Sequence, residues 1–413
     1  MTPLFDETHY LATYPDVADA VRRGDFASGQ DHFLRFGQHE GREPTPPHFS
    51  IESLLASPAT DQLFLELTSR CNLRCVYCAV SQPTYRGIDL RLDAFDAFLE
   101  QMKSRSVRLV TLNGHGESTM VKEWAVIADR LADDGFRLHL TTNLAKRLEA
   151  SEISALSRFE MILVSIDTID PDLLACLRRG LKLETLLENV ELIQRFSAAH
   201  GRRPEIAISC TVGDLSAPGI GDLVDAMLAR GITTFRFGDL AEYAPIQSTL
   251  RMRHVSALAE PELAVVRERF CAAIGRIEAA GAASQTDSSL VALLLGNRAL
   301  AGTEERSTKI GDKAVHSSNL EKRQTRDCLD PWRLAFVQAD ASVRPCCFFE
   351  EKLGTLEEQP LGEIVEGEAF RQLRREIATG ELRANCRSCS GRPAVDVDVF
   401  ARKLQKHLQA AGR

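Results

Sequence analysis

The sequence lacks long hydrophobic runs and an excess of positive charge. Its longest apolar stretch, Leu290–Leu295, is far shorter than the roughly 20 residues that a membrane-spanning helix needs. The N-terminus does not join a basic start to an apolar segment, as a secretion signal would. The formal net charge is -8 at pH 7, whereas a nucleic-acid surface needs a basic face to meet the phosphates. These absences predict a cytoplasmic protein that binds neither nucleic acid nor a membrane.

Cysteine, in contrast, is abundant. The 413 residues include 11 cysteines, and 44% of the chain is hydrophobic, enough to bury one large core or two moderate ones. A reducing cytosol does not maintain disulfides, so metal binding or catalysis explains these cysteines better.

The patterning divides the chain into five parts. Residues 1–48 mix aromatic, apolar and polar positions and end in a proline-rich breaker run, which predicts a small helical module. Residues 55–300 alternate short β-rich runs with amphipathic helical ones and are helical from about residue 255. A polar linker over 301–327, a compact cysteine-bearing unit over 328–393 and a C-terminal helix over 394–413 complete the prediction.

The fold class that follows is α/β, with a partial (β/α)6 TIM-like barrel as the main domain. The predicted strands are Leu63–Thr68, Arg108–Asn113, Arg137–Thr142, Met161–Asp167, Glu205–Val212 and Thr233–Gly238. In such a barrel the functional residues gather in the loops at the carboxyl ends of the strands.

Three thiols directly follow the first predicted strand, at Cys71, Cys75 and Cys78. A [4Fe–4S] cluster normally takes four cysteines, so three leave one iron open to another ligand. A structural zinc site is the alternative, but it would need a fourth ligand, usually from a second pair. The spacing, together with Tyr77 before the last cysteine, resembles the signature of the radical S-adenosylmethionine (SAM) superfamily.

The resemblance implies that SAM binds the open iron and is cleaved to a 5′-deoxyadenosyl radical, which removes a hydrogen atom from the substrate. It also implies an external electron donor such as flavodoxin or ferredoxin. The segment after the second strand resembles the family's glycine-glycine-glutamate element, with His115 in place of the second glycine. By resemblance, the SAM contacts are Tyr77, Gly114, Gly116, Glu117, Thr142, Asn143, Ser165, Asp167 and Arg179. Taken singly, Ser165 and Asp167 fit helix caps or turns equally well.

A second cysteine group lies near the C-terminus. Its predicted ligands are Cys328, Cys346, Cys386 and Cys389, the first two brought together by a β-hairpin. Four thiolates suit a fully ligated [4Fe–4S] cluster or a zinc ion. The pattern resembles the α+β SPASM and twitch domains that follow many radical SAM barrels, which implies two [4Fe–4S] clusters in all. Cys347 is then a packing residue or a competitor for the role of Cys346.

A cluster whose irons are all bound by protein cannot bind substrate, so its expected role is to accept an electron, which favours oxidation. Members of the family oxidise or epimerise sugar alcohols or modify ribosomal peptides. The N-terminal segment is short for a winged-helix leader-binding domain and resembles a module of bacterial proteins linked to surface carbohydrates. We therefore expect dehydrogenation of a carbohydrate or another hydroxylated small molecule. The alternatives are a peptide-modifying maturase, a radical epimerase and a non-enzymatic zinc protein.

Three residues are candidates for direct catalysis. Asp239 and Glu242 follow the sixth strand, where a carboxylate could take a substrate hydroxyl proton. Cys210, in the fifth strand, could return a hydrogen atom to a radical, as epimerases require. Solvated loop carboxylates and a small buried thiol are the simpler interpretations.

Overall fold

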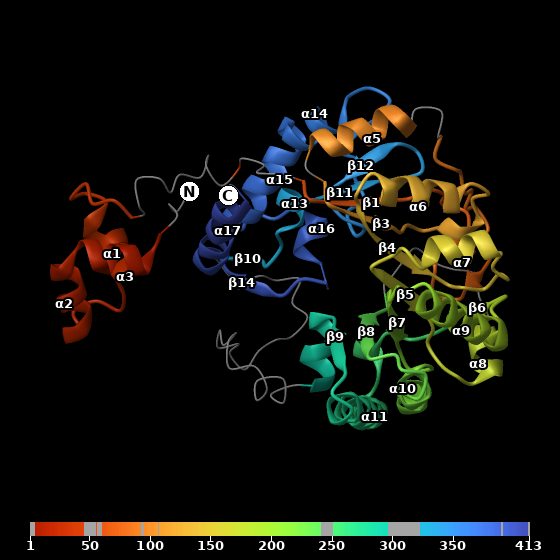
Figure 1. Cartoon of the computed structure of the whole chain (residues 1–413). Helices are drawn as coiled ribbons and strands as arrows, with labels where there is room; N and C mark the ends of the chain where they lie inside the picture. The colour runs from red at the N-terminus through yellow and green to blue at the C-terminus, as the bar shows by residue number, and fades with distance from the viewer. Residues whose placement is uncertain are drawn as a thin grey trace.

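A computed structural model describes residues 5–44, 55, 60–91, 95–105, 107–240, 251–295, 323–389 and 391–411. Its centre is a ten-stranded sheet in the order β13-β12-β11-β1-β3-β4-β5-β7-β8-β9 (Figure 1). The parallel strands are β1 (Gln62–Leu65), β3 (Leu109–Leu112), β4 (Arg137–Thr142), β5 (Met161–Ser165), β7 (Glu205–Val212), β8 (Thr234–Asp239), β9 (Ala283–Thr286) and β11 (Leu334–Val337). The antiparallel β12 (Ser342–Arg344) and β13 (Gly354–Thr355) extend the sheet at one edge. The six predicted strands are confirmed.

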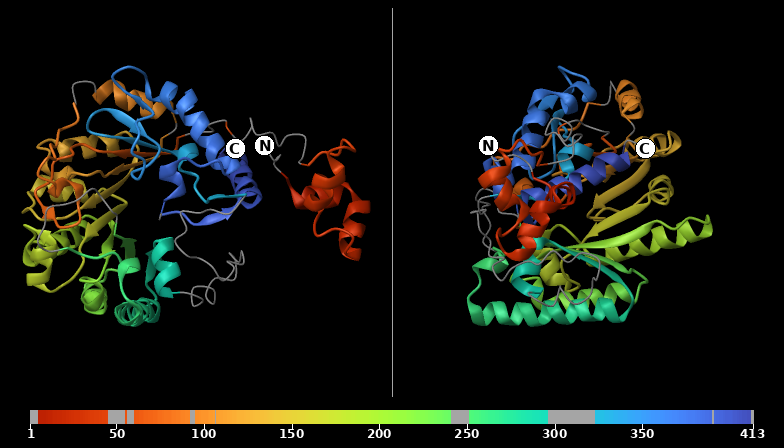
Figure 2. Two further views of the ribbon diagram at one scale, coloured as in Figure 1. Left: turned by 180° about the vertical axis from the view of Figure 1, so that it is seen from behind. Right: turned by 90° about the vertical axis from the view of Figure 1, so that its left-hand side faces the viewer.

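The helices lie along the outer face of this curved sheet (Figures 1 and 2). They are α5 (Phe95–Ser104), α6 (Trp124–Asp133), α7 (Ala150–Leu156), α8 (Pro171–Leu177), α9 (Leu183–Ala199), α10 (Ile220–Leu228), α11 (Glu260–Ala279) and α12 (Ser288–Leu290), with shorter turns η2 (Ala79–Ser81), η3 (Ser118–Met120), η4 (Ala217–Gly219), η5 (Val255–Ala257) and η6 (Val291–Leu295). A two-stranded ribbon, β2 (Arg74–Cys75) with β6 (Arg178–Arg179), lies apart from the sheet.

The two faces of the sheet differ in their exposure to solvent. Along β4, β5 and β7, buried residues such as Leu140, Val164 and Ile208 pack with the outer helices. Their neighbours, such as Thr141 and Ser165, point the other way and are partly exposed, because successive strand residues face opposite sides. The inner face, away from the helices, is therefore partly exposed and mixes polar residues with apolar ones such as Leu163.

Two segments differ from the prediction. The polar strand β9 lies in the region predicted as helical; it pairs with β8 through its backbone, and its exposed side chains give no apolar pattern to detect. Residues Gln324–Arg326, predicted to end the linker, form β10, which pairs with β14 (Ala394–Asp396). These three residues therefore belong to the C-terminal unit.

The C-terminal unit has its own small core, in which Trp332, Leu373 and Phe400 are fully buried. Its helices are α13 (Asp330–Arg333), α14 (Leu361–Glu366), α15 (Glu368–Thr379), α16 (Ala384–Arg387) and α17 (Val397–Ala411). Because β11 pairs in parallel with β1, the unit continues the sheet of the barrel.

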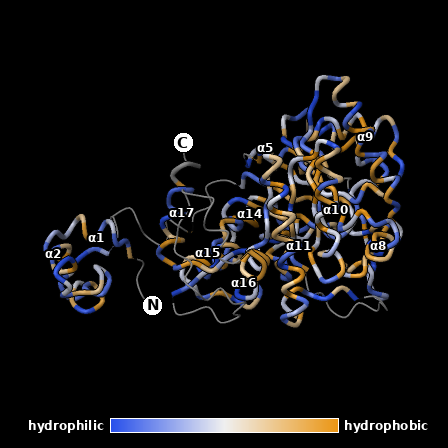
Figure 3. The backbone as a smooth tube through the Cα atoms, turned by 90° about the horizontal axis from the view of Figure 1, so that it is seen from below, coloured by the Kyte–Doolittle hydropathy of each residue, from blue (hydrophilic) through white to orange (hydrophobic). Residues whose placement is uncertain are grey.

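The N-terminal module is helical, as predicted. It contains α1 (Glu7–Thr13), α2 (Pro15–Arg23), α3 (Gly29–His32) and η1 (Phe33–Gly37) around a small aromatic core of its own. It lies on the side of α17 (Figure 1), where the Phe5 amide donates to Asp398 at 3.4 Å. Hydrophobic and hydrophilic residues alternate along the backbone in every unit (Figure 3). None of the helices in the described part of the chain combines the length and apolar character that crossing a bilayer demands.

Candidate cluster and cosubstrate site

The first three cysteines lie on one loop that leaves the carboxyl end of β1. Cys75 is in β2, opposite Arg178 of β6, and the Val76 amide donates to the Leu177 carbonyl at 2.9 Å. The Cys78 amide in turn donates to the Cys75 carbonyl at 3.1 Å. The ribbon thus fixes the cysteine loop to the chain segment that follows α8.

The three thiols share one short loop and are largely shielded from solvent. Burial, together with the smaller effect of the Cys78 charge, raises the pKa of Cys71 to about 11 and that of Cys75 to about 12. A bound metal would supply the positive charge that holds such thiols as thiolates. Among the described residues, no three His, Cys, Asp or Glu side chains are grouped for a single metal ion, so the cluster ligands remain predictions.

Two glycines press the loop after β3 against the end of β1. A Cβ on Gly114 would lie 2.3 Å from Glu66 Oε1, and one on Gly116 would lie 2.2 Å from the Thr68 carbonyl oxygen. Both distances are shorter than any real contact, so only glycine fits at these positions. This close approach of the two chain segments explains why the sequence has glycine at both positions.

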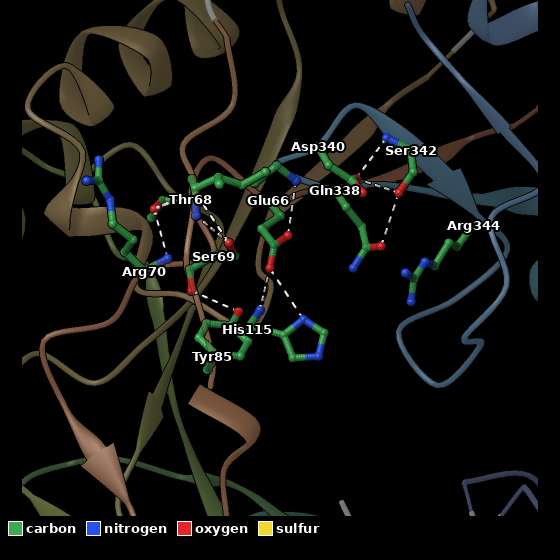
Figure 4. A network of polar contacts seen from close by, with 12 residues as sticks. Glu66, Thr68, Ser69, Arg70, Tyr85, His115, Gln338, Asp340, Ser342 and Arg344 are labelled. Atoms are coloured by element: carbon green, nitrogen blue, oxygen red, sulfur yellow. Dashed lines mark hydrogen bonds and ion pairs between the residues drawn. The ribbon is translucent and has the colours of Figure 1, made fainter. Parts of the chain in front are cut away.

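His115, between the glycines, is held by Glu66 (Figure 4). Glu66 Oε1 accepts from the His115 amide at 2.6 Å and lies 3.5 Å from its Nδ1, while Oε2 accepts from the Ala339 amide at 3.0 Å. Glu66 is buried and connects the barrel loop to the turn between β11 and β12. Sequence analysis missed this residue; its only signal is an acidic side chain at the end of an apolar strand.

Glu117 is turned inward and held by protein donors, and its SAM contact stays a prediction. Its side chain is buried, and its Oε1 accepts from the Thr119 and Thr142 hydroxyls, both at 2.8 Å. Its Oε2 accepts from the Asn143 amide at 2.7 Å. Burial raises the pKa of Glu117, although these hydrogen bonds oppose the shift. Glu117 and Thr142 therefore join the end of β3 to the end of β4.

Asn143 brings the end of β4 against the first cysteine. Its Nδ2 donates to Asn72 Oδ1 at 2.9 Å and to Cys71 Sγ at 3.7 Å. Its Oδ1 accepts from the Ala145 amide at 2.9 Å. Asn143 thus touches the cysteine loop itself, beside the position where a cosubstrate would meet the cluster.

Asp167 also has several protein partners, and its SAM contact stays a prediction. It is fully buried and receives the Arg178 guanidinium on both oxygens, at 2.8 and 2.9 Å. It also accepts from the Tyr77 hydroxyl and, at 2.9 Å, from the Thr211 amide. Arg178 lies over the Tyr77 ring at 5.6 Å. The Tyr77 hydroxyl is thus directed to Asp167. Of the adjacent arginines Arg178 and Arg179, either of which the family resemblance allows as the partner of the SAM carboxylate, Arg178 is the buried one.

The SAM contacts of Arg179 and Ser165 stay predictions. Arg179 is exposed on β6, and its Nε donates to the Arg74 carbonyl at 2.7 Å, next to the cysteine loop. Ser165 ends β5 on the inner face, level with Ser209 of β7.

Of the three candidates for direct catalysis, the structure describes Asp239 and Cys210. The Asp239 side chain is 2% exposed, shares the face of Phe237, and is 3.0 Å from His254 Nε2. Burial would raise the pKa of Asp239, but hydrogen bonds from His254 and Ser289 bring it below its usual range. This buried cluster argues against a proton-accepting role toward a substrate. Glu242 lies outside the described residues.

Cys210 is 1% exposed, and its thiol donates to the Asp167 carbonyl at 3.8 Å. Burial raises the pKa of Cys210 well above its ordinary value. The structure therefore favours its alternative interpretation as a small core residue.

The second group of cysteines lies on several elements of the C-terminal unit, and their assignment as ligands of one cluster stays a prediction. Cys328 follows β10, Cys346 follows β12, Cys386 lies in α16, and Cys389 comes just after it. Burial raises the pKa of each of the first three, and in each a neighbouring thiolate adds to the shift. The predicted hairpin is formed by β11 and β12. Cys347, exposed beside Cys346, is also within reach of the Cys389 charge.

Two family models match this arrangement. The Radical SAM superfamily model matches residues 65–198, from the end of β1 to α9. The SPASM model, an iron–sulfur cluster-binding domain, matches residues 328–390.

Known proteins agree with both matches. A probable GTP 3′,8-cyclase from Methanococcus maripaludis is 24% identical over 47% of this chain and 62% of its own length. The chain spans 40 to 62% of the length of the first curated relatives. Streptococcus suis SuiB bound to precursor peptide SuiA is 16% identical with a TM-score of 0.56, over 82% of this chain and 73% of that chain. Native anSMEcpe with bound AdoMet is 16% identical with a TM-score of 0.54, over 85 and 98%. The chain therefore belongs to the radical SAM superfamily and carries a C-terminal SPASM domain.

Proposed function

We propose that this radical SAM enzyme oxidises a hydroxylated small molecule, in the first instance a carbohydrate, at a C–H bond beside a hydroxyl group. Bound SAM and its cluster would supply a 5′-deoxyadenosyl radical that removes the hydrogen atom. An auxiliary [4Fe–4S] cluster would then accept the second electron. A cytoplasmic flavodoxin or ferredoxin would supply the electron that starts the reaction.

The residues divide between these tasks. Cys71, Cys75 and Cys78 would hold the first cluster, and Cys328, Cys346, Cys386 and Cys389 the second. The glycine loop and Asn143 would shape the SAM position beside Cys71, and Arg179 would pair with the methionine carboxylate through its planar guanidinium. Asp167, Arg178 and Glu117 would hold these groups in place through their buried hydrogen bonds.

The observation that carries the proposal is the inner face of the sheet. Thr141, Ser165, Ser209 and Thr211 place partly exposed hydroxyl side chains on three neighbouring strands; Ser165 is level with Ser209, whereas Thr141 is level with Leu163. Side chains of this kind both donate and accept hydrogen bonds, as substrate hydroxyl groups do. These hydroxyl groups lie at and near the carboxyl ends of the strands, where barrel enzymes bind their substrates.

Peptide modification is the second candidate. Its support is that SuiB, which shares this fold, was solved with a precursor peptide. An extended inner face with these hydroxyl groups could also hold a peptide backbone. A panel of both substrate classes separates the two.

The test begins with anaerobic reconstitution and iron and sulfide counts. Two clusters predict about eight irons per chain, and a variant with Cys71, Cys75 and Cys78 changed to Ala should keep about four. A colourless zinc protein would contradict the proposal outright. Cys389→Ala should lose the other four or so, while the barrel cluster stays.

Substrate class is tested next, with dithionite, SAM and deuterated candidates. Deuterium transfer from a sugar carbon into 5′-deoxyadenosine, together with a new carbonyl product, supports the proposal. Transfer from peptides alone would replace it with peptide modification. Exchange of a carbinol hydrogen with solvent, without a carbonyl product, would indicate epimerisation.

A further inference from the structure

Arg326 presents a positive charge to the auxiliary cysteines. It is the last residue of β10, two positions before Cys328, and its side chain is half-buried. Its Nε donates to the Cys386 carbonyl at 3.3 Å and its Nη1 to the Arg392 carbonyl at 3.2 Å. Its Nη2 donates to the carbonyl of Arg387. All three acceptors are neutral, and together they bracket the segment that carries Cys386 and Cys389.

Two neighbouring arginines, Arg392 and Arg383, are arranged differently because each pairs with a carboxylate; Arg387 and Arg344 instead donate to the carbonyls of Leu382 and Phe349, both at 3.0 Å. Arg392 donates to Asp330 at 2.7 Å. Arg383 donates through Nε to Glu376 at 2.6 Å and through Nη1 to Glu351 at 3.1 Å. The positive charges of Arg392 and Arg383 are therefore largely cancelled locally, whereas the hydrogen-bond acceptors of Arg326 in the described part of the chain are all backbone carbonyls. The charges that act on Arg326 are those of the Cys389 and Cys386 thiolates.

An uncancelled cation beside an iron–sulfur cluster affects its redox chemistry. Reduction adds one negative charge to the cluster, and a fixed positive charge nearby stabilises that reduced form. The potentials of such clusters follow their net charge, hydrogen bonding and exposure. Half-buried charges are also screened less by salt than exposed ones.

We propose that Arg326 is a positioning residue that raises the reduction potential of the auxiliary cluster, so that the cluster can oxidise the substrate radical. The inference rests on the proposed function, because it requires the C-terminal cysteines to hold a [4Fe–4S] cluster. In that step the carbon radical loses one electron to the oxidised cluster. The hydroxyl O–H bond breaks, the proton goes to water, and a C=O bond forms.

The experiment isolates the auxiliary cluster in the full chain by changing Cys71, Cys75 and Cys78 to Ala. In this background, Arg326→Gln and Arg326→Lys are reconstituted and titrated with dithionite against redox dyes, followed by absorption and EPR. Arg230→Gln is the matched control, since Arg230 also donates to a carbonyl, that of Ala226 at 2.9 Å, but lies in the turn that follows the barrel helix α10.

At the midpoint potential of the parent, we expect the ratio of oxidised to reduced cluster to be about tenfold higher in Arg326→Gln. This ratio corresponds to a midpoint potential lowered by about 59 mV for a one-electron couple. Arg326→Lys keeps the charge and should keep most of the potential, and Arg230→Gln should not change it. An iron-loaded Arg326→Gln protein with the parent's potential would overturn the inference. So would an Arg326→Lys shift as large as that of Arg326→Gln.

If Arg326→Gln fails to bind the cluster, the Arg326→Lys variant gives the answer. A reduction potential equal to that of the parent then supports the charge effect, and a tenfold change in its oxidised-to-reduced ratio refutes it. Failure of the proposed function would look different. The parent chain without Cys71, Cys75 and Cys78 would then hold zinc or no metal, before any change at Arg326.

Discussion

The buried ion pair between Asp167 and Arg178 should decide whether the cysteine loop keeps its shape. The Asp167 side chain is fully buried and that of Arg178 is 9% exposed, with two hydrogen bonds between them. Asp167→Asn preserves the volume but leaves the guanidinium without its counter-charge. Removing one partner of a buried pair costs about 3–5 kcal/mol, because the other charge remains unpaired in a low dielectric. We expect the free energy of unfolding to fall by that amount.

The location of the pair adds a second effect. Arg178 lies opposite Cys75 in the β2–β6 ribbon, and Tyr77, between two predicted cluster ligands, donates to Asp167. Loosening Asp167 should therefore release the cysteine loop as well. We expect Asp167→Asn to retain about four of about eight irons after desalting, those of the C-terminal unit.

Urea unfolding followed by far-UV circular dichroism measures the first effect, and iron analysis the second. Asp129→Asn is the control, since it removes a more exposed partner of Arg158, whose Nη1 lies 2.9 Å away; such surface pairs contribute about 0–1 kcal/mol. A loss for Asp167→Asn no larger than that of Asp129→Asn would refute the reasoning. Unchanged iron content would refute the link to the loop.

Three further predictions concern separate parts of the chain. Gly116→Ala should destabilise the barrel by about 1–3 kcal/mol in urea unfolding and weaken SAM binding in equilibrium dialysis. Gly275→Ala is the control: a Cβ at this position meets open space, so the substitution should stabilise the barrel by about 1 kcal/mol. Because the folded pKa of Asp239 is lowered, its stabilising contribution is present above its ordinary value and is lost as the pH falls below about 4; the difference in urea midpoint from Asp239→Asn should shrink in that range. Cys347→Ala should keep the irons that Cys389→Ala loses, as measured by iron analysis.

Much of the fold was predictable from local patterns. Apolar alternation marked six strands, because each buries one face against helices and leaves the other partly exposed. It missed β9, whose polar residues are held through backbone pairing with β8 rather than by burial. The cysteine loop was predictable because its residues are close together in sequence.

The supporting acids were not predictable in the same way. Asp167 and Glu117 lie at strand ends where a ligand would be expected, and only side-chain geometry shows that protein donors bind both oxygens of each carboxylate. For Asp239 the strand pattern itself was informative. Side chains alternate along β8, so Asp239 shares the outward face of Phe237 and points away from the inner face of the sheet. Glu66 pairs with groups 49 and 273 residues away, a distance that no local pattern records.

Glu66 also explains how two cysteine sites far apart in sequence are held in fixed relation. The Glu66 amide donates to the Val337 carbonyl at 2.9 Å, continuing the parallel pairing of β1 with β11. Its carboxylate then binds the glycine loop on one side and the β11–β12 turn on the other (Figure 4). The first cysteine loop leaves β1 just beyond this residue, and Cys346 follows β12. Because rigid strands connect the two sites, the separation that an electron would cross is set by sheet geometry and not by a flexible linker.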